Sequence, residues 1–269
     1  MTEENKLITE RKKKLEAIKL NNKAYPNTFR KKDYANNISD EYRDLEKEDI
    51  AEKNIPVSIA GRLLTIRNMG NSSFANLHDE SGNIQIYLQK KQVGEDSYAL
   101  FNNLDLGDIV GIEGVLFKTR TGELTINTSS IMLLSKSLRP LPEKFHGIAD
   151  IEIKYRQRYL DLMINPETKS LFKTRSKIVS QIRNFFIEDD YLEVETPMMH
   201  MIPGGAAAKP FVTHHNSLDL DLYLRIAPEL FLKRCIIGGY EKVFEINRSF
   251  RNEGLSVKHN PEFTMIEFY

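Results

Sequence analysis

The chain has 269 residues, and its 38 Lys and Arg residues balance 38 Asp and Glu residues, so the formal net charge is zero. This length exceeds the roughly 100–200 residues typical of one domain and favours two domains, each able to bury a core. The charge balance excludes a protein that is basic over its whole surface, so any contact with nucleic acid must be local.

The cysteine content and the hydropathy pattern favour a reducing, cytoplasmic environment. Cys235 is the only cysteine and lies in an apolar run, which favours an inert buried thiol and excludes an internal disulfide. The N-terminus is charged, and no stretch approaches about 18 uncharged apolar residues. The sequence therefore predicts neither export nor a membrane span.

Residues 5–20 combine spaced apolar side chains with the basic run Arg11–Lys14, which predicts an amphipathic helix with a basic face. The pattern alone leaves open whether that face is solvated or contacts nucleic acid. We expect residues 1–50 to form a basic, helical N-terminal extension.

Residues 55–134 consist of short alternating apolar runs separated by turn residues, which indicates a small β-barrel. A helix-length segment around Tyr98 and Phe101 lies between the third and fourth runs. Five strands with a helix inserted there are typical of an OB-fold. The predicted strands are 57–62, 74–77, 84–88, 109–112 and 124–127.

Two prolines, Pro140 and Pro142, break both helix and strand pairing, so we predict a linker over 135–142. The barrel domain is therefore assigned to 51–145 and a second domain to 146–269. In the second domain a long helix over 168–189 is followed by strand-like runs. The expected fold class is α+β, built mainly on antiparallel strands at 191–194, 222–226, 242–250 and 263–269, with a helix beginning at Ala227-Pro228-Glu229 and ending at Gly238-Gly239.

The last two strand-like runs should form a hairpin whose polar residues share faces. Arg251 and Glu253 fall on one face of the first strand, and Phe263, Glu267 and Tyr269 on one face of the second. Charged residues on a buried face must be paired, exposed or used on a ligand. The pattern leaves two explanations open, a cross-strand Arg251–Glu267 salt bridge and a ligand site.

Sequence motifs in this half resemble those of a known enzyme family. Phe250-Arg251-Asn252-Glu253, followed by a loop and His259-Asn260-Pro261-Glu262-Phe263-Thr264-Met265-Ile266-Glu267, resembles motif 2 of the class II aminoacyl-tRNA synthetases, in particular the lysyl-tRNA synthetases. The segment from Asp190 to Met199 resembles motif 1, although Asp190 stands where glycine is common. The resemblance implies a homodimer formed through motif 1.

The resemblance implies ATP-dependent activation of lysine to lysyl-adenylate, followed by transfer of lysine to the 3′ end of lysine tRNA. On this basis Arg251 would bind the α-phosphate of ATP, as suits a planar guanidinium. Glu253 would place the adenine, His259 would approach the distal phosphates, and Phe263 would stack on the adenine ring.

The same resemblance implies a lysine pocket. Glu267 and Tyr269 would bind the far end of the substrate, Glu229 would lie near its α-amino group, and Gly205 would let a lid approach closely. An ε-ammonium is a compact charge with three donors, which calls for a carboxylate and further acceptors.

In the barrel, Arg67, Phe74, Gln85 and Glu123 match the positions that read the anticodon in this branch. Phe74 would stack on a base, and Gln85 could address a Watson–Crick edge, although without the resemblance Gln85 would be taken for an ordinary surface residue.

No metal site is expected within the chain, because His214 and His215 are adjacent in a strand and point to opposite faces. Mg²⁺ would bridge the ATP phosphates, but its ligands and the motif 3 arginine are expected after motif 2 and have no counterpart here. The resemblance therefore predicts an incomplete active site, with little or no lysylation by this polypeptide alone.

Three alternatives remain. An aspartyl- or asparaginyl-tRNA synthetase would share the barrel and motifs, but its pocket would need a cation in place of Glu267. A non-catalytic tRNA-binding or dimerising fragment is compatible with the barrel. A relative that modifies a protein is disfavoured, because such relatives usually lack the barrel.

Overall fold

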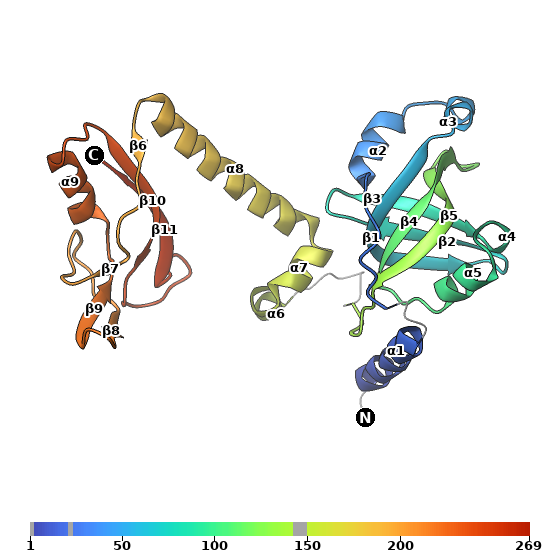
Figure 1. Ribbon diagram of the computed structural model, residues 1–269, viewed down its shortest axis with the longest axis horizontal. Helices are drawn as coiled ribbons and strands as arrows, with labels where there is room; N and C mark the ends of the chain where they lie inside the picture. The colour runs from blue at the N-terminus through green and yellow to red at the C-terminus, as the bar shows by residue number, and fades with distance from the viewer. Residues whose placement is uncertain (1–2, 21–23, 142–149) are drawn as a thin grey trace. The chain divides into compact units, whose positions relative to one another are not determined.

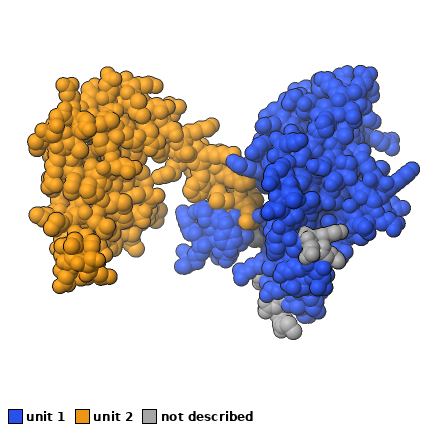
Figure 2. Space-filling model, in the orientation of Figure 1, with its two compact units in different colours: residues 1–160 blue, residues 161–269 orange. Residues whose placement is uncertain are grey.

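The computed structural model describes residues 3–20, 24–141 and 150–269. The chain divides into two compact units, residues 1–160 and 161–269 (Figures 1 and 2). The predicted boundary between residues 145 and 146 lies outside the described residues. Within the part of the chain that is described, no helix is long and apolar enough to cross a membrane.

The first unit is built around a closed five-stranded barrel with the strand order β1-β2-β3-β5-β4. Strands β3 and β5 pair in parallel and the other neighbours are antiparallel. Inward positions are filled by aliphatic side chains such as Ile59, Leu77 and Ile86, all fully buried. The predicted OB-fold is therefore confirmed, with strands β1 Pro56–Asn68, β2 Ser72–His78, β3 Asn83–Gln89, β4 Ile109–Lys118 and β5 Leu124–Ser135.

Helices surround the barrel (Figure 1). Two short ones follow β3, at the point where the sequence predicts a helix, and the longer of them buries Tyr98 and Phe101. The helices of this unit are α1 Glu3–Leu20, α2 Ala35–Tyr42, α3 Lys47–Lys53, α4 Lys90–Val93, α5 Glu95–Asn102 and α6 Ile151–Arg156.

The segment expected to be a linker is attached to the barrel at its start. Lys136 is buried, binds Asp108 at 2.7 Å and also contacts Asp105. On α1, Arg11 donates to the carbonyl oxygens of Ser137 and Arg139, each at 3.1 Å. The predicted linker follows the end of β5, and a buried lysine among carboxylates fixes its first residues to the barrel.

The second unit begins with α7 Arg158–Ile164, which spans the division, and the long helix α8 Pro166–Glu188. One sheet has the order β11-β10-β6 and another the order β7-β9-β8. The pairing is antiparallel except for β6 with β10. The α+β class is thus confirmed, with β6 Leu192–Glu193, β7 Met199–His200, β8 Val212–His215, β9 Leu220–Leu224, α9 Glu229–Ile237, β10 Val243–Phe250 and β11 Glu262–Phe268.

Aromatic side chains join α8 to the β10–β11 hairpin. The ring of Phe186 stacks on Phe244 with 5.1 Å between centroids and lies 4.8 Å from the ring of Phe268. Both Phe186 and Phe244 are buried. Such ring pairs contribute about 0.5–1.5 kcal/mol each beyond the area that they bury, so this cluster fixes the hairpin against the helix.

The end of α8 shows why glycine is common at the position of Asp190, the first residue of the segment that resembles motif 1. Asp190 has φ +61°, Tyr191 N–H donates to the Phe186 carbonyl at 3.0 Å, and Asp190 N–H donates to the Ile187 carbonyl at 3.1 Å. The rings of Phe186 and Tyr191 also meet edge to face at 5.1 Å. These are the bonds and the apolar contact of a Schellman motif, whose left-handed residue is usually glycine.

We predict that Asp190→Gly raises the free energy of unfolding by about 1 kcal/mol, because it removes the left-handed strain of a side chain and an acidic group at a helix C-terminus. Denaturant unfolding followed by far-UV circular dichroism measures this. Asp189→Gly is the matched control, because it also removes an acidic group from the helix C-terminus, but at φ −97° it relieves no left-handed strain and it loses the ion pair with Lys242 at 3.3 Å. A destabilised Asp190→Gly variant would contradict the assignment.

Candidate active site

The β10–β11 register decides which side chains share a face. Glu245 pairs with Glu267 and Ser249 pairs with Phe263, and beyond the strand Arg251 N–H donates to the Pro261 carbonyl at 2.9 Å. Directly paired residues in an antiparallel ladder project to the same side. Arg251 and Glu267 therefore lie on one face but at opposite ends of the hairpin, and the explanation of a cross-strand Arg251–Glu267 salt bridge is wrong.

At one end of this face Arg251 lies beside Phe263. The guanidinium carbon is 5.1 Å from the ring centroid, within cation–π range. Its Nε is buried and donates to no atom of the described residues. Because buried donors are almost always satisfied, an acceptor such as a phosphate oxygen would complete this arrangement.

The other two predicted nucleotide residues lie in the segment between the strands. A carboxylate oxygen of Glu253 accepts from the backbone N–H of Lys209 at 3.3 Å, and Asn252 N–H donates to the Lys209 carbonyl at 2.7 Å. His259 is exposed and its Nδ1 lies 2.7 Å from the Ser256 hydroxyl. The structure thus brings Arg251 and Phe263 together, with Glu253 bound to the 209 segment and His259 at the loop.

At the other end of the face, carboxylates and a phenol gather around a lysine side chain. Tyr269 donates its hydroxyl to Glu267 Oε1 at 2.8 Å. Lys233 Nζ donates to Glu229 Oε1 at 2.6 Å and lies 5.5 Å from the Tyr269 ring centroid. The chain's own ε-ammonium therefore pairs with Glu229 and lies near Tyr269, with the lysine side chain about half exposed.

Burial raises the pKa of the Glu267 carboxyl, and the nearby charges of Glu229 and Glu245 raise it further, while the Tyr269 hydroxyl and Lys233 oppose the shift. Burial and the bond to Glu267 also raise the pKa of the Tyr269 phenol, so Tyr269 stays protonated and donates. Glu267 thus favours the arrival of a cation, which would stabilise its ionised form.

Gly205, which was predicted to let a lid approach closely, lies where a side chain has no room. Its φ is +87°, and a Cβ atom built on it would lie 2.8 Å from the Cβ of Glu229 and 3.2 Å from that of Ala227. Any larger residue would push the 205 segment away from the start of α9.

Two residues of this site were missed by the sequence analysis. Arg225 Nη1 donates to Glu245 Oε1 at 2.6 Å, and both side chains are almost fully buried. The second carboxylate oxygen of Glu245 accepts from the Thr196 hydroxyl at 2.6 Å. The alternation of β10 could have placed Glu245 on the face of Arg251, but nothing in the sequence indicates its partner.

The four predicted anticodon residues come together on the outer face of the barrel. Arg67, Phe74, Gln85 and Glu123 line one small hollow of about 90 Å³. Gln85 Nε2 donates to Glu123 Oε2 at 2.9 Å, and its oxygen accepts from the Thr125 hydroxyl at 2.9 Å. The amide is therefore oriented from both ends.

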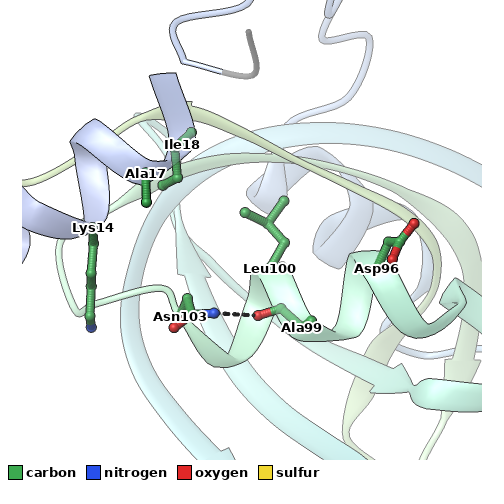
Figure 3. A pocket seen from close by; sticks show the side chains of 7 residues that line it. All are labelled: Lys14, Ala17, Ile18, Asp96, Ala99, Leu100 and Asn103. Atoms are coloured by element: carbon green, nitrogen blue, oxygen red, sulfur yellow. Dashed lines mark hydrogen bonds between the residues drawn. The ribbon is translucent and has the colours of Figure 1, made fainter. Parts of the chain in front are cut away.

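A larger hollow, of about 560 Å³, lies between α1 and α5 (Figure 3). Its lining combines the small and apolar side chains of Ala17, Ile18, Ala99 and Leu100 with the polar side chains of Lys14, Asp96 and Asn103. Lys14 in its wall is already paired with Asp105 at 2.8 Å. The hollow brings together no set of groups typical of catalysis.

Within the described ranges, no three His, Cys, Asp or Glu side chains gather as a metal ion would require. Nδ1 of His214 lies 3.0 Å from Asp221 Oδ1, and Nδ1 of His215 accepts from Leu218 N–H at 3.3 Å.

Parts of the chain are similar in sequence to known protein families. Residues 150–269 match the class II tRNA synthetases (D, K and N), and residues 57–134 match an OB-fold nucleic acid binding domain. Lysine–tRNA ligases of Methylobacillus flagellatus, Thiobacillus denitrificans and Neisseria meningitidis serogroup A are 58%, 59% and 58% identical over 267 residues, which is 99% of this chain and 52%, 53% and 53% of theirs. The chain spans about half the length of these relatives.

Glu267→Gln should stabilise the fold at neutral pH. Because the folded pKa of Glu267 is raised, ionisation costs stability above that pKa, and the cost disappears below the unfolded value of about 4.3. Urea unfolding should therefore show a more stable variant at about pH 7 and no difference at about pH 4.

The control for this comparison is Glu262→Gln. Glu262 lies at the other end of β11, is half exposed and pairs with Arg248 at 2.8 Å, so its loss should not stabilise the fold. A Glu267→Gln variant less stable than the parent at neutral pH would show that the carboxylate is favourably paired and contradict the raised pKa.

Proposed function

We propose that the chain is part of a lysine–tRNA ligase of the class II tRNA synthetases (D, K and N), because residues 150–269 match that family and lysine–tRNA ligases are 58% and 59% identical over 99% of this chain. The proposed reaction activates lysine with ATP and transfers it to lysine tRNA. The proposed domains are an N-terminal extension over 1–50, an anticodon-binding domain over 51–145 and a catalytic domain over 146–269. The proposed location is the cytoplasm.

The observation that carries the proposal is the acidic end of the hairpin face. Glu229 pairs with an alkylammonium, that of Lys233, at 2.6 Å, and the charge of Lys233 also acts on Glu267 beside Tyr269. A free lysine offers the same group with three donors. An aspartate side chain would meet carboxylates there, which argues against the aspartyl and asparaginyl alternatives.

In the proposed first step a carboxylate oxygen of lysine attacks the α-phosphorus of ATP, the bond to the β-phosphate oxygen breaks, and pyrophosphate leaves. Arg251 is proposed to stabilise the negative charge on the α-phosphate, with its unsatisfied Nε as one donor. Phe263 would stack on adenine, Glu253 would orient the base, and His259 would approach the distal phosphates.

In the proposed second step a ribose hydroxyl at the tRNA 3′ end attacks the lysyl carbonyl, and AMP leaves. The contribution of these residues is to position reactants and stabilise charge. Mg²⁺ is used by this enzyme family, and among the described residues no three His, Cys, Asp or Glu side chains gather to hold it.

Anticodon binding is proposed for the barrel hollow. Phe74 offers a ring for stacking, Arg67 a positive charge, and Gln85, held by Glu123 and Thr125, a fixed amide. Stacking of this kind contributes about 1–3 kcal/mol per base. This set supports recognition of an unpaired base, which is the usual mode of sequence-specific RNA binding.

A homodimer is proposed from the exposed face of α8. Leu171, Ile178 and Phe185 are 66%, 54% and 66% exposed, although they recur on one side of the helix. Contiguous exposed apolar residues of this kind mark interaction surfaces. A second copy of the chain is the proposed partner, through the segment that resembles motif 1.

Pyrophosphate exchange tests the proposed activity. The 269 residues, joined to the remaining part of the Methylobacillus flagellatus relative, should catalyse lysine-dependent ATP–pyrophosphate exchange that aspartate and ornithine neither support nor efficiently inhibit. Arg251→Ala should lower the rate by about 100-fold or more.

Arg248→Ala is the matched control, because Arg248 is a half-exposed guanidinium that pairs with Glu262. It should retain exchange. Exchange that depends on aspartate or asparagine, or that does not depend on any amino acid, would contradict the proposal; tight tRNA binding without exchange would favour the non-catalytic alternative.

A further inference from the structure

Lys233 on α9 places a cation at the acidic end of the hairpin face. Its Nζ donates to Glu229 Oε1 at 2.6 Å and lies 5.5 Å from the centre of the Tyr269 ring. Its charge also acts on Glu267, whose carboxylate accepts from the Tyr269 hydroxyl at 2.8 Å. An alkylammonium of the chain therefore pairs with a carboxylate that is proposed to bind an ammonium of the ligand.

The carboxylates at this end match the two ammonium groups of a lysine ligand without counting Lys233. Glu229 is proposed for the α-ammonium and Glu267 for the ε-ammonium, while Glu245 is already neutralised by Arg225 at 2.6 Å. With both ligand groups bound, Lys233 becomes a third cation beside two carboxylates. Because like charges this close repel each other, Lys233 and the ligand compete for Glu229.

The side chain of Lys233 can leave this position without disturbing the core. It is 51% exposed, and that of Glu229 is 29% exposed. The two residues are four apart on α9, and pairs of this spacing on a helix surface are weak. The flexible four-carbon stem of a lysine lets its ammonium move into solvent. The contact therefore occupies Glu229 in the empty site and yields to a ligand that replaces it.

We propose that Lys233 is an intramolecular competitor of the ligand's α-ammonium, which binds Glu229 while the pocket is empty and is displaced when lysine binds. The inference rests on the proposed function as a lysine–tRNA ligase and adds a contact that raises the lysine concentration needed to fill the site. A ligand must bring its own α-ammonium to displace Lys233. A ligand such as 6-aminohexanoate, which is lysine without the α-amino group, leaves Lys233 in place.

Calorimetric titration with lysine and with 6-aminohexanoate tests this competition. The protein is the 269 residues joined to the remaining part of the Methylobacillus flagellatus relative. Lys233→Met removes the charge, keeps an unbranched side chain that favours helix, and should bind lysine about fivefold more tightly, since a weak ion pair and a weak ring contact no longer oppose binding. Its affinity for 6-aminohexanoate should change by about twofold or less. Lys233→Arg keeps a cation and should bind lysine as the parent does.

Lys242→Met is the matched control, because Lys242 lies beside the end of α8, pairs with Asp189 at 3.3 Å and lies 5.2 Å from the centre of the Tyr191 ring. It should bind both ligands as the parent does. If Lys233→Met binds lysine no more tightly than the parent, or gains equally for both ligands, competition for Glu229 is refuted and the proposed function stands. If the parent itself binds lysine no more tightly than norleucine, the proposed lysine site fails, and this inference with it.

Discussion

The buried ion pair between Arg225 and Glu245 is the interaction on which the candidate active site depends. Its 2.6 Å bond joins the end of β9 to β10, and Arg225 also donates to the carbonyl oxygens of Arg248 at 2.8 Å and Thr196 at 3.2 Å. One guanidinium thus ties together three separate segments. Breaking such a pair by removing one partner typically costs about 3–5 kcal/mol, because the remaining charge is buried alone.

This pair also sets the charge of the neighbouring pocket. Glu245 and Glu267 are directly opposite on one face, and two facing carboxylates would repel each other. Arg225 neutralises Glu245, so Glu267 remains as the carboxylate available to a ligand, with Tyr269 bound to it and Glu229 nearby. Under the proposed function, selectivity for an ammonium would follow from this charge, and Arg251 at the far end of the face would provide the opposite charge for a phosphate.

Much of this arrangement could be predicted from local sequence. Alternation and turn residues predict the barrel and the hairpin, and alternation along each strand places Phe263 and Glu267 on one face and Arg251 on a face of the other strand. What could not be predicted depends on contacts between residues distant in sequence. The register excludes an Arg251–Glu267 bond, the partner of Glu245 is twenty residues earlier in the chain, and Lys136 fixes the start of the predicted linker to the barrel.

Selectivity of the Glu267 pocket for an ammonium can be measured by calorimetric titration with lysine and with norleucine, which lacks only the ε-ammonium. The protein titrated is the 269 residues joined to the remaining part of the Methylobacillus flagellatus relative. Lysine should bind at least 100-fold more tightly than norleucine and release protons to the buffer, because binding favours the ionised form of Glu267. Equal affinity for norleucine, or lysine binding without any proton release at a pH near the raised pKa of Glu267, would contradict it.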